Sequence, residues 1–175
     1  SAYYDATGLR WVNPSPNMRS LTQALLYPGI GLLETTNLSV GRGTDTPFEV
    51  IGAPWLDGVR LARVLNNRLF PGTAFVPIEF EPDASKFAGE VCGGVNVIVT
   101  DRAAFDPLRT GFEMARQLRR LYPDAWEFEA YDRLLVNEAA LEAVREARPF
   151  TEIEAGYGEG LEKFIRRRQE YLIYD

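Results

Sequence analysis

Residues 34–55 constrain the fold most strongly, because they contain too much glycine and proline to form one regular element. They read Glu-Thr-Thr-Asn-Leu-Ser-Val-Gly-Arg-Gly-Thr-Asp-Thr-Pro-Phe-Glu-Val-Ile-Gly-Ala-Pro-Trp. The rest of the chain must therefore form a rigid scaffold around a long polar loop, and such loops concentrate binding and catalytic groups. Gly41 and Gly43 flank Arg42, so the backbone there can adopt positive φ angles or approach a ligand closely.

Length and composition indicate one ordinary globular domain. The chain has 175 residues, of which 46% are hydrophobic and 25% charged. Its net charge of -6 argues against broad electrostatic binding of nucleic acid or of an anionic membrane, which requires clustered Lys and Arg. No apolar run reaches the roughly 18 residues of a membrane span. We therefore expect no nucleic acid partner and no membrane span in this chain.

The chain has no histidine and a single cysteine, Cys92. An internal disulfide and a thiolate metal cluster are excluded, and the commonest metal ligand is missing. We therefore predict neither a metal site nor a cofactor. Any acid–base chemistry must come from carboxylates, or from another chain or domain.

The hydrophobic spacing predicts an α+β fold, with a small mixed β-sheet and helices packed on one of its faces. Glycines 93 and 94, after Cys92, predict a tight turn, and Pro77 predicts that its strand lies at an edge or contains a bulge. Strands are expected at residues 9–12, 30–33, 76–80 and 95–99. Helices are expected from the Ser20/Gln23 capping box to Pro28-Gly29, from Trp55 to Leu69, from Asp106-Pro107 to Tyr122, at residues 137–148, and from Ile153 to Leu172.

Several motifs resemble those of one known family over nearly the whole chain. Together they are similar to the C-terminal half of bacterial exo-β-N-acetylmuramidases, the NamZ-type glycosidases. The motifs are Asn13-Pro-Ser-Pro-Asn17-Met, Tyr27-Pro-Gly29, Glu34-Thr-Thr-Asn37-Leu-Ser39-Val-Gly-Arg42-Gly-Thr44, Pro47-Phe48, Gly52-Ala-Pro-Trp55, Cys92-Gly-Gly94 and Arg168-Gln-Glu-Tyr171-Leu-Ile-Tyr174.

The resemblance implies an enzyme that removes terminal N-acetylmuramic acid from the non-reducing end of cell-wall fragments, so the substrate would be a peptidoglycan-derived saccharide. It also implies that residues 1–175 form the C-terminal domain of a two-domain protein. The partner would be an N-terminal Rossmann-like domain, with the active site in the cleft between the two halves. On this interpretation the chain alone is inactive. The substrate class implies an extracytoplasmic location, in the periplasm or at the cell surface.

Glu34 is the candidate catalytic residue. Glycosidases usually place two carboxyl groups on either side of the scissile bond, and this chain supplies one plausible member. Because Glu34 directly follows the predicted strand at residues 30–33, we expect a rigid and partly desolvated carboxyl group suited to general-acid work. The alternative is a structural role, in which Glu34 pairs with Arg42 or caps backbone amides in the loop.

Arg42 is a candidate for reading the lactyl carboxylate of N-acetylmuramic acid. A guanidinium can grip a carboxylate with two parallel hydrogen bonds, which would favour this sugar over N-acetylglucosamine. The alternative is an internal clamp, in which Arg42 binds Glu34 or Asp45.

Three further residues are predicted to bind substrate. Asn37 and Thr44 suit sugar hydroxyls and the acetamido group, although such residues also stabilise turns. Trp55 could stack on a sugar face, or it could belong to the core. Two other functions remain open, namely a non-catalytic glycan-binding or docking domain and, more weakly, a phosphate cradle at residues 41–44.

Overall fold

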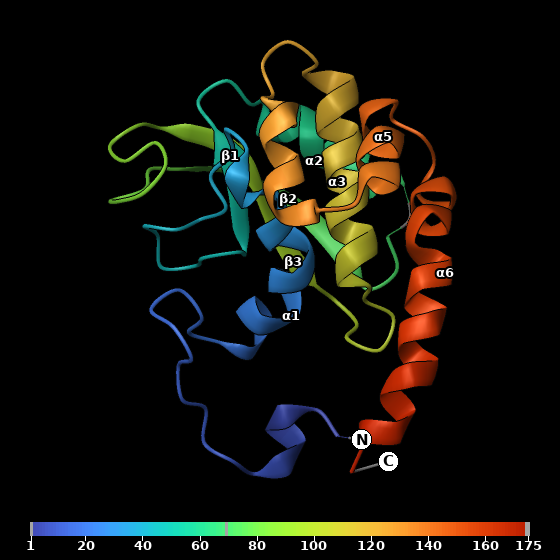
Figure 1. The fold of residues 1–175 in the computed structure, drawn as a ribbon. Helices are drawn as coiled ribbons and strands as arrows, with labels where there is room; N and C mark the ends of the chain where they lie inside the picture. The colour runs from blue at the N-terminus through green and yellow to red at the C-terminus, as the bar shows by residue number, and fades with distance from the viewer. Residues whose placement is uncertain (1, 69, 174–175) are drawn as a thin grey trace.

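The computed structural model describes residues 2–68 and 70–173. Its ribbon shows helices gathered around a small sheet, with the long helix α6 along one side (Figure 1). The strands are β1 (Val50–Ala53), β2 (Thr73–Phe80) and β3 (Cys92–Val99). The α-helices are α1 (Leu21–Ile30), α2 (Gly58–Asn66), α3 (Pro107–Leu121), α4 (Asp132–Leu135), α5 (Glu138–Arg145) and α6 (Phe150–Arg168). The 3-10 helices are η1 (Tyr4–Thr7), η2 (Gly31–Thr35), η3 (Phe128–Tyr131) and η4 (Gln169–Tyr171).

The described residues form one sheet in the order β1-β3-β2. The α+β class is confirmed, and both pairings are antiparallel, so the sheet is not mixed. As Pro77 predicted, β2 lies at an edge, where its missing N–H removes no ladder bond. The β-branched run at residues 95–99 forms most of the central strand β3.

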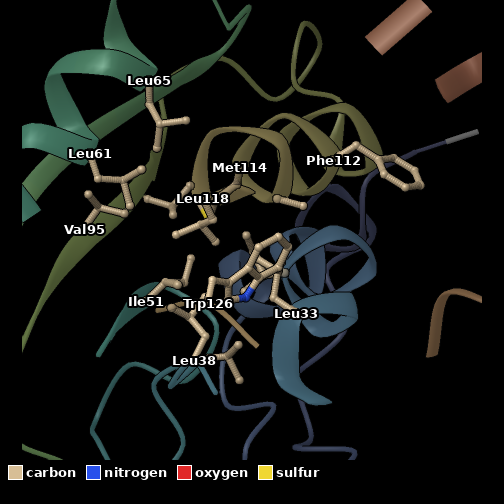
Figure 2. Close-up of a cluster of buried hydrophobic side chains, with 14 of the residues drawn as sticks. Leu33, Leu38, Ile51, Leu61, Leu65, Val95, Phe112, Met114, Leu118 and Trp126 are labelled. Atoms are coloured by element: carbon tan, nitrogen blue, oxygen red, sulfur yellow. The ribbon is translucent and has the colours of Figure 1, made fainter. Parts of the chain in front are cut away.

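The hydrophobic core lies between one face of this sheet and the helices. Ile51 and Val95 project from the sheet into the same cluster as Leu61 of α2 and Leu118 of α3 (Figure 2). Each of these four side chains is fully buried. The core fixes β1 and the end of α1, which border the long polar loop on both sides.

The interpretation of residues 28–33 is wrong. Pro28-Gly29 does not end α1, and residues 30–33 form no strand, because α1 continues directly into the 3-10 helix η2. The glycine serves a helix crossing instead. A Cβ atom at Gly29 would lie 1.8 Å from the backbone oxygen of Pro107, at the start of α3. Glu34 therefore lies on a helix and does not follow a strand.

Other boundaries also differ from prediction. Residues 9–12 form no strand, and Leu9 and Val12 are exposed without a pairing partner among the described residues. The residues 92–94 that predicted a turn begin β3. Trp55 precedes helix α2, which Asp57 caps, and the predicted end at Leu69 lies outside the described residues. The short strand β1 was missed, since its four residues lie inside the segment 34–55 that the sequence analysis read as one loop.

The last helices follow their sequence signals more closely. The side chain of Asn137 accepts a hydrogen bond from the Ala140 N–H and caps α5, which ends at Arg145, three residues before the predicted end. Helix α6 begins at Phe150 and tolerates its three glycines. Apolar side chains near its C-terminal end, including Phe164 and Ile165, are exposed. Among the described helices, none has the length and apolar character needed to cross a bilayer.

Cys92 is a small buried residue of β3, with no exposed side-chain surface. Burial, with a smaller contribution from Glu90, raises the pKa of its thiol from 9.0 to about 11. Since the thiolate is the reactive form, iodoacetamide should label the folded protein at least about 100-fold more slowly near pH 8 than the protein in concentrated urea. Mass spectrometry of both time courses checks this. Equal labelling rates would contradict a buried, protonated thiol.

Candidate functional site

Glu34 and Arg42 form an ion pair at the start of the polar loop. Arg42 Nη2 donates a hydrogen bond to Glu34 Oε2 over 3.0 Å. The pair remains accessible to solvent, because 32% of the Arg42 side chain and 30% of the Glu34 side chain are exposed. The structure therefore confirms the alternative in which Glu34 pairs with Arg42. Asp45 is not part of this clamp, because its ion-pair partner is Arg19, at 4.0 Å.

The backbone around Arg42 has the predicted glycine conformations. Gly41 and Gly43 have φ angles of 79° and 83°. At Gly43 a side chain is also sterically excluded, because a Cβ atom there would lie 2.2 Å from the backbone oxygen of Ala84. Arg42 itself extends over the ring of Phe48, with 5.2 Å between its Cζ atom and the ring centroid. The guanidinium is thus held between a carboxylate and an aromatic face.

Lys86 is a third charged residue of the site, and the sequence analysis missed it. Its ammonium group donates hydrogen bonds to the backbone oxygens of Glu34, at 3.0 Å, and of Thr36. Burial lowers the pKa of Lys86, while the charges of Glu34 and Glu127 act in the opposite direction. A hint was available in the sequence, because Lys86 is one of only two lysines beside seventeen arginines.

These charged groups line a small pocket of about 90 Å³. A pocket of this size can hold a carboxylate or an acetamido group, whereas sites that enclose a whole small molecule usually measure about 300–1,000 Å³. The pocket is therefore too small to enclose a whole sugar. The lining residues are Glu34, Leu38, Ser39, Val40, Arg42, Ser85 and Lys86.

The other predicted ligands lie outside this lining and are engaged within the chain. Asn37 donates to the Ala125 carbonyl and accepts from the Glu127 N–H, both at 2.8 Å. Thr44 donates to the Gly41 carbonyl at 2.7 Å. Trp55 is partly buried against the core and packs edge-on against a tyrosine ring. These contacts match the structural alternatives, and sugar binding by the three residues stays a prediction.

A wider hollow of about 490 Å³ lies near the N-terminus of α2. Its two carboxylates are Asp57, which caps α2, and the exposed Glu79, and no cation lines it. We place the candidate site in the smaller pocket, where one carboxylate and two positively charged side chains lie together. Among the described residues, no group of three or more His, Cys, Asp or Glu side chains is arranged to hold a metal ion.

The fold and the charged pocket define an α+β domain in which one carboxylate and two cations line a small surface pocket. Residues 25–174 match the family model described as "Exo-beta-N-acetylmuramidase NamZ, C-terminal". The chain belongs to this family and corresponds to its C-terminal domain.

Individual relatives agree with this assignment. The chain is 38% identical over 174 residues to the peptidoglycan beta-N-acetylmuramidase NamZ of Bacillus subtilis. The aligned residues make up 98% of this chain and 42% of that protein. A crystal structure of a DUF1343 family protein from Bacteroides fragilis matches with a TM-score of 0.86 and 26% identity, over 98% of this chain and 47% of the other. A second such protein from the same organism matches with a TM-score of 0.70 over 93% and 44%, and its 24% identity shows the fold alone. The chain spans less than half the length of these relatives.

Proposed function

We propose that this chain forms one wall of the active site of a peptidoglycan glycosidase, which releases terminal N-acetylmuramic acid from the non-reducing end of cell-wall fragments. The observation that carries the proposal is the pocket in which Glu34, Arg42 and Lys86 converge. The similarity to the Bacillus subtilis enzyme over 98% of the chain supports the substrate class.

In the proposed mechanism, Glu34 supplies one of the two carboxyl groups that flank the glycosidic bond. Helix η2 holds it in place, and the Arg42 contact fixes the orientation of its carboxylate. The second carboxyl group and the rest of the saccharide site come from a further domain of the same protein, because the pocket of about 90 Å³ is too small for a sugar. We infer that this partner is the Rossmann-like N-terminal domain implied by the resemblance, and that this chain alone is inactive.

The test is release of an aryl group from a chromogenic β-N-acetylmuraminide by the intact protein. We expect the intact protein to release the aryl group from the terminal sugar, and residues 1–175 alone to release none. An intact protein that binds the saccharide but never cleaves it would support the alternative, a non-catalytic glycan-binding or docking domain. The substrate class also leads us to propose an extracytoplasmic location, which fractionation of the producing cells would test.

Arg42 has the donors needed to read the lactyl carboxylate, because only Nη2 of its guanidinium is bonded to Glu34. Replacing Arg42 by Lys removes the planar fork, so preference for the N-acetylmuraminide over the N-acetylglucosaminide should fall about tenfold. The ratio of the two kcat/KM values in the intact protein measures this preference.

Arg19→Lys is the matched control, since Arg19 lies outside the pocket and pairs weakly with Asp45. It should leave the ratio unchanged. If Arg42→Lys lowers kcat/KM equally for both sugars, Arg42 is a structural clamp and does not read the lactyl group.

A further inference from the structure

The loop that carries Lys86 is held firmly against the polar loop. It connects β2 to β3, and its Asp83 N–H donates to the Gly43 carbonyl at 2.8 Å. The residues on either side of Lys86 have left-handed backbones, with φ angles of 70° at Ser85 and 61° at Phe87. Such conformations are strained for side-chain-bearing residues and persist where surrounding contacts impose them. This backbone directs Lys86 toward the pocket that Glu34 and Arg42 line.

One N–H donor of the Lys86 ammonium group has no hydrogen-bond acceptor among the described residues. An ammonium group has three N–H donors, and two of them are taken by the Glu34 and Thr36 carbonyls. These two contacts fix the nitrogen atom, so the third donor has a defined direction. A purely structural cap on these carbonyls needs only the first two donors. The third is available to a ligand in the pocket.

The charge of Lys86 also lacks a direct counterion. Among the described residues, no carboxylate oxygen lies within 4.0 Å of the Lys86 ammonium group. Burial lowers the pKa of Lys86, which means that its surroundings compensate the ammonium charge incompletely. The charged side chains lining the pocket are two cations and one carboxylate, so together they carry one net positive charge.

We propose that Lys86 is a specificity residue, whose third N–H joins the Arg42 guanidinium in binding a carboxylate group of the ligand. This inference rests on the proposed function, for which the carboxylate would be the lactyl group of the sugar. Arg42 alone is a weak anion receptor because it already neutralises Glu34. Lys86 supplies a second positive charge for an arriving carboxylate, on a chain whose net charge is -6.

The test compares two hydrolysis-resistant ligands, the S-methyl thioglycoside of N-acetylmuramic acid and its lactyl carboxamide. They have nearly the same shape and differ in the negative charge. Dissociation constants for the intact protein are measured by NMR titration. We expect wild type to bind the acid more tightly, and Lys86→Met to reduce the acid-to-amide preference at least about fivefold. Because the preference is a ratio within one preparation, a partly unfolded fraction does not alter it.

Two further variants sharpen the result. Lys86→Arg keeps the charge and should retain most of the preference. Lys163→Met removes the other lysine, which lies on exposed α6 and pairs with Glu159, and should behave as wild type. An unchanged preference in Lys86→Met would overturn the inference. A wild type without any preference would overturn it together with the role of Arg42. A wild type that prefers the acid but cleaves no muraminide would leave this inference standing while the proposed activity fails.

Discussion

Replacing Glu34 by Gln in the intact protein should lower kcat for cleavage of an aryl β-N-acetylmuraminide by about 10²- to 10⁴-fold, the usual contribution of a positioned acid or base. Glutamine keeps the shape of the side chain, and its amide oxygen can still accept the hydrogen bond that Arg42 donates at 3.0 Å. The polar loop should therefore keep its conformation while the ionisable group is lost. Initial rates across a range of substrate concentrations separate kcat from KM.

A suitable control is Glu49→Gln. Glu49 is a partly buried carboxylate on the same loop, outside the pocket, and it accepts a hydrogen bond from Gln23 at 3.1 Å. This variant should keep wild-type kcat within about twofold, as expected for a group without a role in proton transfer. Full activity in Glu34→Gln would remove Glu34 from the catalytic machinery and leave it as the structural partner of Arg42.

Replacing Gly29 by Ala should destabilise the protein by about 3 kcal/mol, the upper part of the usual range for overpacking a core. In an isolated helix the same change would stabilise by roughly 1 kcal/mol, because alanine restricts the unfolded chain. The crossing of α1 and α3 reverses the sign. The added methyl group would lie 1.8 Å from the Pro107 carbonyl oxygen, and a backbone atom cannot move aside unless the helices separate. Urea unfolding followed by circular dichroism measures the effect.

Gly158→Ala provides the comparison, because Gly158 lies in α6 and a Cβ atom there meets nothing within 4 Å. It should raise stability by up to about 1 kcal/mol. A neutral or stabilising effect at Gly29 would mean that α1 and α3 can separate at little cost. The helical support of Glu34 would then be less rigid than the structure indicates.

Local sequence signals predicted many of the elements, because residues such as helix caps and β-branched side chains strongly favour one type of element. Asp106 caps α3 at the predicted position, and the β-branched residues of the central strand leave little alternative. Short apolar runs were not decisive. Residues 30–33 fit either a strand or a helix by periodicity alone, and packing against α3 selected the helical form. The four residues of β1 were too few to separate from the polar loop.

The candidate site divides in the same way. Glu34 and Arg42 are eight residues apart, and their contact was one of the alternatives that the sequence analysis left open. Lys86 is 52 residues from Glu34 and reaches it only because two loops cross at Gly43 and Asp83. No local pattern encodes such a crossing. The same limit applies to Asn37, whose amide bonds with residues 125 and 127 depend on the tertiary fold.

Because α1 continues into η2, the pocket has two kinds of structural support, a helix for its carboxylate and loops for its cations. Glu34 is carried by a helical rod whose position is set at the Gly29 crossing, whereas Arg42 and Lys86 come from two surface loops. Replacing the loop at residues 81–91 should therefore change which acidic group of a ligand is bound, while the Glu34 carboxylate keeps its position. Under the proposed function, this domain would combine a catalytic carboxylate fixed by a helix with an exchangeable loop that sets ligand preference.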